Sequence, residues 1–223
     1  MGLAGHRSGA DLTNRPGARF GSLRRPVVGR CSVRSRAAGS RGPGPAADVM
    51  RFICSSCGQI HDGFADLALE APYYFYTVPE GERKHRSPLT SDLCSIDDED
   101  FFIRGCLEIP IVGRPDPFSW GVWCSVSRAN FERYREVFDV RQSHVGPFFG
   151  WLSSRLPGYP DTLGLKVMAH LRDEKTRPWF ELEHSDHPLS VDCVQGMTAE
   201  RLQEIYDEAH LHASTAKQCA RRS

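Results

Sequence analysis

The stretch from Phe101 to Val126, FFIRGCLEIPIVGRPDPFSWGVWCSV, constrains the fold of this chain more than any other part of the sequence. Apolar side chains recur at every second position in both of its halves, a period that indicates strands with one buried face. The intervening segment, from Pro110 to Pro117, interrupts the ladder and supplies turn residues. We therefore predict a β-hairpin whose inward-facing side chains are Phe101, Ile103, Leu107, Ile109, Ile111, Phe118, Trp120, Val122, Cys124 and Val126, with Gly105 in the remaining slot.

The opposite face of the first strand carries Phe102, Arg104, Cys106 and Glu108. A hairpin is not stable alone in water, so other segments must cover its apolar face. Residues 91–96 read as a strand that turns through four acidic residues into the hairpin, which gives a three-strand antiparallel meander. Ser127 and Thr198 each fit the N-cap of an amphipathic helix. The predicted fold is α+β, a mainly antiparallel sheet built on this meander with at least two covering helices.

Charge and composition divide the 223-residue chain into a core and two ends. Residues 1–49 hold nine Arg and two Asp and show no strand or helix periodicity. This composition indicates a disordered extension, and the alternatives are an organelle transit peptide or, as we favour, a segment upstream of a true start at Met50. Residues 50–212 are predicted to form a single α+β domain, and 213–223 a frayed polar tail.

The composition also excludes several classes of function. Since the formal charge of the whole chain is zero, residues 50–223 carry a charge of −7, which argues against a nucleic-acid binder. No run approaches the eighteen or so apolar residues of a membrane span. Eight Cys without an apolar secretory signal indicate a reducing compartment, so we expect a cytoplasmic protein without a disulfide framework.

The motif Cys54-Ser-Ser-Cys57-Gly58-Gln59-Ile60-His61 suggests a metal site. Two thiolates separated by two residues can bind one ion from a tight turn, and Gly58 can adopt the positive φ that such a turn needs. His61 follows as a third potential ligand. A structural zinc takes four ligands, and Cys94 is the leading fourth candidate because it lies on a neighbouring predicted strand. Further candidates for the fourth position are Asp92, Cys106, Cys124 and Cys193.

Two other interpretations of Cys54 and Cys57 remain open. A lone CxxC is also found as a redox pair, although redox use favours a strand-to-helix junction rather than the strand-like run that follows Gly58. Unligated Cys is in addition among the most buried residue types, so both residues can be ordinary thiols of the core. Structural zinc is the interpretation that we favour.

A second set of chemically active residues lies in the segment ELEHSDHPL. His184 and His187 can bind a metal, or one of them can act as a base oriented by Asp186. Polar residues are equally expected in a loop that precedes a proline. Arg104 and Glu108 share one strand face, where they can line a pocket or simply pair with each other, and we favour the pair. Nucleophile motifs, phosphate-binding glycine loops and HExxH are absent from the sequence.

A series of motifs resembles a bacterial domain-of-unknown-function family, number 2199, in an order that spans about residues 50–212. The resemblance implies a bacterial origin and transfers no activity, catalytic residue or ligand. The matching segments are CxxCGxxH from Cys54, DLC from Asp92, FFIRGCLEIPI from Phe101, FSWGVWCSVS from Phe118, GWL from Gly150, YPDTLGLK from Tyr159, RPWFELE from Arg177 and HPLSVDCVQGMT from His187.

The sequence therefore predicts a soluble cytoplasmic binding or interaction module with a structural zinc held by Cys54, Cys57, His61 and Cys94. Its partner, a protein or a small molecule, is not specified by the sequence, and neither a membrane nor a nucleic acid is expected. The alternative is a hydrolase-like enzyme with its site among Arg104, Glu108, His184 and His187. Convergence of these four side chains in one pocket would favour the enzyme.

Overall fold

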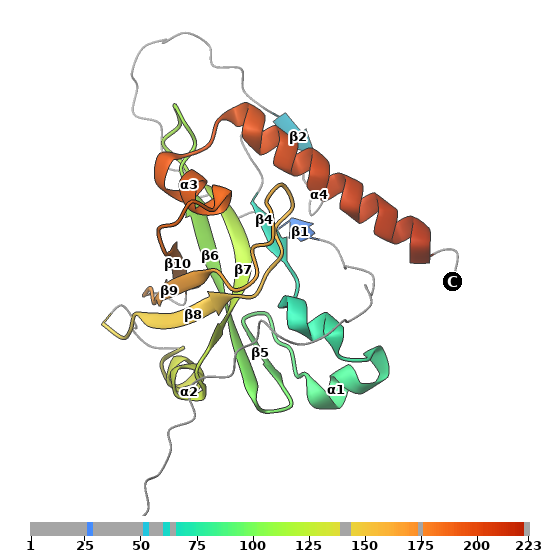
Figure 1. Ribbon diagram of the computed structural model, residues 1–223, viewed down its shortest axis with the longest axis vertical. Helices are drawn as coiled ribbons and strands as arrows, with labels where there is room; N and C mark the ends of the chain where they lie inside the picture. The colour runs from blue at the N-terminus through green and yellow to red at the C-terminus, as the bar shows by residue number, and fades with distance from the viewer. Residues whose placement is uncertain are drawn as a thin grey trace, which may run out of the picture.

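The computed structural model of the protein describes residues 26–28, 51–53, 60–62, 66–138, 144–173 and 176–220, with side chains for 66–138, 144–173 and 176–209 (Figure 1). The strands are β1 (Pro26–Val28), β2 (Arg51–Ile53), β3 (Ile60–Asp62), β4 (Leu67–Leu69), β5 (Leu93–Ile96), β6 (Asp100–Ile109), β7 (Phe118–Val126), β8 (Phe148–Leu152), β9 (Lys166–His170) and β10 (Trp179–Leu182). The helices are η1 (Tyr73–Thr77), η2 (Glu80–Glu82), α1 (Arg83–Arg86), α2 (Arg128–Val137), α3 (Pro188–Gln195) and α4 (Ala199–Ala220).

The predicted hairpin is present as β6 and β7. The two strands pair antiparallel from Phe101 opposite Val126 to Ile109 opposite Phe118, without a break in register. Every apolar side chain assigned to the inner face is buried, and Leu107 and Trp120 lie opposite each other with at most 1% of their surface exposed. The hairpin prediction is therefore confirmed, including which of its faces points into the main core.

The predicted architecture around the hairpin is wrong. Strands β6, β7, β8, β9 and β10 pair in chain order, and β10 then pairs with β6, so the five strands close into a barrel. The strand direction alternates along this series, because each consecutive pair is antiparallel, so the fifth strand runs the same way as the first. Closure of an odd-numbered series must therefore make one parallel pair, and Trp179 of β10 opposite Cys106 of β6 is that pair. The fold is a mixed closed barrel with added strands, rather than an antiparallel meander sheet under covering helices.

Strands β6 and β7 are long enough for each to pair with several other strands. The first half of β6 pairs with β5, and Cys106 near its middle meets β10. Trp120 and Gly121 of β7 pair with β4, which runs parallel to them, while Cys124 and the following residues pair with β8. Strand β1 extends this sheet by pairing with β4, and β2 and β3 form a separate two-stranded sheet.

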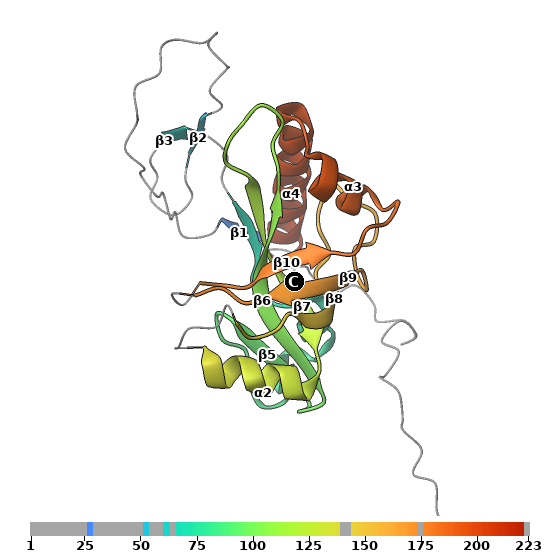
Figure 2. The same ribbon diagram turned by 90° about the vertical axis from the view of Figure 1, so that its left-hand side faces the viewer.

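Helices lie at the two ends of the barrel in both views: α2 at one end, and α3 with α4 at the other (Figures 1 and 2). Ser127 and Thr198 cap α2 and α4, because their side-chain oxygens accept hydrogen bonds from the backbone N–H groups of Asn130 and Arg201 at 3.2 Å. The main core fills the barrel and continues under the helices, where it includes Phe131, Tyr134, Leu189, Leu202 and Ile205.

A second apolar cluster covers the outer face of the hairpin. Phe102 and Trp123, which point away from the barrel interior, are fully buried against Val78, Cys94 and Ile96. The segment from η1 to β5 thus covers one half of this outer face. The other half, which carries Arg104, Cys106 and Glu108, is partly exposed.

The predicted chain ends are described in part. Of residues 1–49 the structure describes β1, so the prediction of a disordered extension stays a prediction. Helix α4 continues beyond His212 to Ala220. None of the helices in the described part of the chain has the length and apolar character needed to cross a membrane.

Candidate functional site

A cleft of about 390 Å³ opens on the half of the β6 outer face that the second cluster leaves uncovered. Four separate segments line it: the loop before β5, strand β6, the end of α2 and the β9–β10 loop. Their lining residues are Asp92, Cys106, Tyr134, Phe138, Arg172, Thr176 and Arg177.

Backbone hydrogen bonds to β6 fix two of these segments. The N–H of Cys106 donates to the carbonyl of Pro178 at 2.8 Å, which holds the end of the β9–β10 loop. Two residues earlier, the N–H of Arg104 donates to the carbonyl of Asp92 at 2.9 Å, which holds the loop before β5. Closure of the barrel between β10 and β6 therefore places Arg177 beside Asp92, 85 residues earlier in the chain.

Two ion pairs involve the arginines that line the cleft. The Nε of Arg177 donates to Oδ1 of Asp92 at 2.6 Å, and Nη2 of Arg172 donates to Oε1 of Glu108 at 2.6 Å. The hydroxyl of Ser91 contacts the second carboxylate oxygen of Asp92. Both arginines come from the β9–β10 loop, and both carboxylates come from the segments that this loop contacts.

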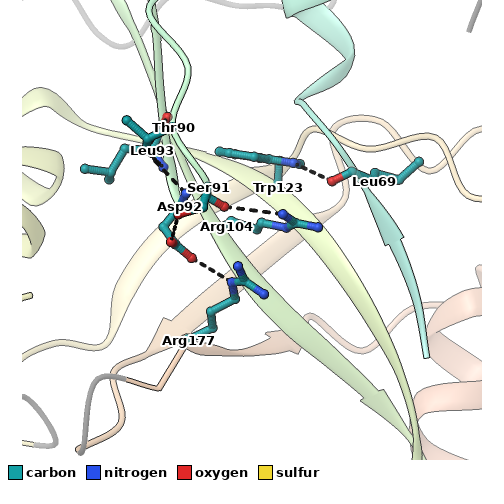
Figure 3. A network of polar contacts seen from close by, with 8 residues as sticks. All are labelled: Leu69, Thr90, Ser91, Asp92, Leu93, Arg104, Trp123 and Arg177. Atoms are coloured by element: carbon teal, nitrogen blue, oxygen red, sulfur yellow. Dashed lines mark hydrogen bonds and ion pairs between the residues drawn. The ribbon is translucent and has the colours of Figure 1, made fainter. Parts of the chain in front are cut away.

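Arg104 adds a third guanidinium next to the ion pair of Asp92 and Arg177 (Figure 3). Its Nη1 donates to the carbonyl of Ser91 at 3.3 Å, and its guanidinium carbon lies 5.8 Å from the ring centroid of Trp123. The indole of Trp123 is held by a 3.0 Å bond from its Nε1 to the carbonyl of Leu69. Burial, followed by repulsion from Arg177, lowers the pKa of Arg104. Its Nε is buried and has no hydrogen-bond partner among the described residues.

The remaining polar groups of the cleft stay protonated at neutral pH. Burial raises the pKa of the Cys106 thiol, an effect that outweighs its hydrogen bond with Ser119 and the nearby charge of Arg172. Burial also raises the pKa of Tyr134, and the charge of Asp92 adds to the increase. A neutral thiol is a weak nucleophile.

The structure separates the four residues of the alternative enzyme site. Arg104 and Glu108 both lie on the outer face of β6 beside the cleft but bind different partners, Ser91 and Arg172. His187 is the N-cap of α3, where its Nδ1 accepts a hydrogen bond from the N–H of Leu189 at 3.1 Å. The exposed His184 lies in the loop between β10 and α3. Figures 1 and 2 place α3 at the opposite end of the barrel from α2, which forms a wall of the cleft.

The predicted zinc ligands fall largely outside the described residues. Cys54 and Cys57 are not described, and the structure describes the backbone of His61. Cys94 is 1% exposed in the second apolar cluster, where burial raises the pKa of its thiol to about 12. Among the residues that the structure describes, no group of three or more His, Cys, Asp or Glu could hold a metal ion.

Sequence reasoning missed Tyr134, Arg172 and Arg177 as site residues. Tyr134 follows the apolar stripe of α2 and is buried, so its pattern indicates only a core position, and Arg172 lies in no recognisable motif. Asp92 and Arg177 each begin one of the motifs named above, DLC and RPWFELE. The two motifs meet in the structure through the 2.6 Å ion pair between these residues. Their separate positions in the sequence gave no indication of this contact.

Fold and site together define a small protein with a closed five-strand barrel, helices at both barrel ends and a charged cleft on the outer face of β6. The chain belongs to the family described as uncharacterised proteins conserved in bacteria, DUF2199, which it matches over residues 53–197. This match confirms the resemblance seen in the sequence and includes every residue that lines the cleft. No curated protein and no solved structure matches the chain.

Proposed function

We propose that this protein is a binding module whose ligand, a small molecule, occupies the cleft between β6, α2 and the β9–β10 loop. The observation that carries the proposal is the convergence of four segments, between residues 92 and 177, around one space of about 390 Å³. That volume lies in the range of small-molecule sites, which typically combine apolar walls with a few placed polar groups. Tyr134 and Phe138 supply the apolar wall, and the arginines supply the polar groups.

Binding is better supported than the alternative, hydrolysis. A hydrolase needs a base or a nucleophile close to the reacting bond. At the cleft, the Cys106 thiol is held neutral, and the carboxylates of Asp92 and Glu108 are both engaged by arginine. The two candidate histidines belong to the α3 end of the barrel.

A fragment screen followed by NMR tests the site. We expect fragments to shift the backbone amides of Cys106, Tyr134 and Arg177. Thr176→Trp should fill the cleft and weaken binding about tenfold or more, because small ligands depend on burial of most of their surface. Thr77→Trp is the matched control. Thr77 and Thr176 each donate a 2.7 Å hydrogen bond to the carbonyl three residues earlier, and Thr77 lies outside the cleft.

Two results would contradict the proposal. Fragments that bind Thr176→Trp as tightly as the wild type would place the site elsewhere. A screen in which no fragment shifts the three cleft amides would remove the cleft as a binding site. Turnover of ester or amide fragments during the screen, lost in Thr176→Trp, would instead support the hydrolase.

We further propose a structural zinc bound by Cys54, Cys57, His61 and Cys94. The support is local: β2 and β3 pair antiparallel with Ile53 opposite Ile60, so the CxxC segment joins two adjacent strand ends, as in a zinc knuckle. Such an ion would stabilise the chain, because four protein ligands leave no open coordination position for catalysis.

Metal analysis of untagged protein tests the zinc. We expect about one zinc per chain, and Cys57→Ser should lose both the ion and cooperative unfolding. Cys193→Ser is the control and should keep the ion. Loss of zinc in Cys94→Ser would identify the fourth ligand, whereas retention would remove Cys94 from the set. Wild-type protein that is free of metal after growth with zinc, and still unfolds cooperatively, would refute the site.

A further inference from the structure

We infer that the cleft binds its ligand through an oxyanion, a carboxylate or phosphate group, held by Arg172 and Arg177. This inference rests on the binding function proposed above and specifies the chemical class of the ligand. The ligand is a small organic molecule with one such group and an apolar body.

The first argument is the balance of charge. Three guanidinium groups, those of Arg104, Arg172 and Arg177, lie at or beside the cleft, and the two carboxylates that they contact belong to Asp92 and Glu108. The charged residues that line the cleft itself, Asp92, Arg172 and Arg177, sum to +1, although residues 50–223 as a whole carry −7. An excess of positive charge within an acidic domain favours an anion at this position.

The second argument is the number of donors that remain. A guanidinium carries five N–H groups and accepts no hydrogen bond. The described ion pairs are made through one nitrogen of each arginine, Nη2 of Arg172 and Nε of Arg177. Among the described residues, no partner is bound by the two terminal nitrogens of Arg177, the pair that binds carboxylate or phosphate side by side. Both arginines line the same cleft, and the charges of both act on Cys106 within it, so a single anion there can contact both.

The third argument is the repulsion among the cations. Arg177 disfavours the charged form of Arg104, and the buried Nε of Arg104 lacks a partner among the described residues. Like charges held close together in a partly buried site raise the free energy of the empty protein. An anion between the loop and β6 would reduce that repulsion, whereas a cationic ligand would increase it.

The apolar wall of the cleft indicates the rest of the ligand. Tyr134 and Phe138 lie on the α2 side, across from the β9–β10 loop that carries the arginines. A molecule with an acidic group at one end and an aromatic or aliphatic body can contact both sides. The volume of about 390 Å³ suits a metabolite-sized molecule.

Titration with four related probes tests this chemistry: benzoate, phenyl phosphate, benzamide and benzylamine. Calorimetry or NMR on the full chain should show binding of benzoate or phenyl phosphate, and the comparison between these two distinguishes a planar carboxylate from a phosphate. Neutral benzamide should bind about tenfold or more weakly, since hydrogen bonds to a charged group are lost. Benzylamine should not compete with either anion.

Three variants separate anion binding from a structural role. Arg172→Met should weaken binding of the preferred anion about tenfold or more. Glu108→Gln should strengthen it several-fold, because it releases Arg172 and removes a negative charge. Loss of a purely structural ion pair would not strengthen binding. Arg133→Met is the matched control: Arg133 is paired with Glu136 at 3.0 Å on the exposed side of α2, and its loss should leave affinity unchanged.

The results that overturn the inference differ from those that overturn the binding function. Equal affinity for benzoate and benzamide at the cleft amides, or preference for benzylamine, would refute the oxyanion while leaving the binding module in place. Unchanged or weaker anion binding by Glu108→Gln would also refute it, as would no anion binding at about 10 mM. Failure of every fragment to shift the cleft amides would remove the proposed function itself.

Discussion

Gly105 on β6 shows how a single residue permits the barrel to close. A Cβ atom at this position would lie 2.4 Å from Cε1 and 2.5 Å from Cζ of Phe180 on β10, closer than nonbonded carbon atoms approach. Phe180 is 1% exposed and fills the interior at the place where its strand approaches β6. The sequence identified Gly105 as a gap in the apolar alternation, and the structure shows which side chain occupies that gap.

We predict that Gly105→Ala lowers the free energy of unfolding by about 1 to 3 kcal/mol, the usual cost of overpacking a core. In a Phe180→Leu background the same change should cost less, because the colliding ring is removed, and a double-mutant cycle from urea unfolding measures the difference. Gly81→Ala is the control, since no atom lies within 4 Å of its added Cβ. Equal costs in both backgrounds would show that Phe180 does not limit this position.

At the scale of strands and helices, the sequence predicted where the strands lie better than it predicted which strands pair with each other. Alternation identified β6 and β7 and their inner face, because the period of two reports which side chains are buried. It does not report which strand lies beside which. The closing pair joins Trp179 to Cys106, a contact between residues 73 positions apart that no local pattern encodes.

The candidate site was hidden for the same reason. Arg177 and Asp92 meet because β10 returns to β6, and the cleft that both residues line exists only in the closed barrel. The expected pairing of Arg104 with Glu108 was the natural inference for an open sheet, in which the two side chains share a face without other neighbours. In the barrel, the β9–β10 loop contacts that face, and Arg172 takes Glu108 as its partner.

At the scale of the whole molecule, buried thiols should make stability depend on alkaline pH. Cys124 is fully buried, and burial raises the pKa of its thiol. Burial, with a contribution from the charge of Asp192, raises the pKa of Cys193 to about 12. An unfolded chain has thiol pKa values near 8.5, so above that pH the unfolded state releases protons that the folded state retains.

The sign of the effect follows from that difference in bound protons. Where the folded state binds more protons than the unfolded state, the free energy of unfolding falls as pH rises. The stabilisation is complete below about pH 8.5 and is lost toward the folded-state pKa, which for Cys193 is about 12. Each fully retained thiol contributes a slope of about 1.4 kcal/mol per pH unit in this window.

We therefore predict that wild-type stability, measured by urea unfolding, is level between about pH 7 and 8 and declines by about pH 9.5. Cys193→Ala should be less stable than the wild type at pH 7.5 but should show a shallower decline, because one retained proton is removed. Val194→Ala changes the exposed neighbour of Cys193 on the same helix and should keep the wild-type slope. If Cys193→Ala declines as steeply as the wild type, this thiol ionises as readily in the folded protein as in the unfolded chain.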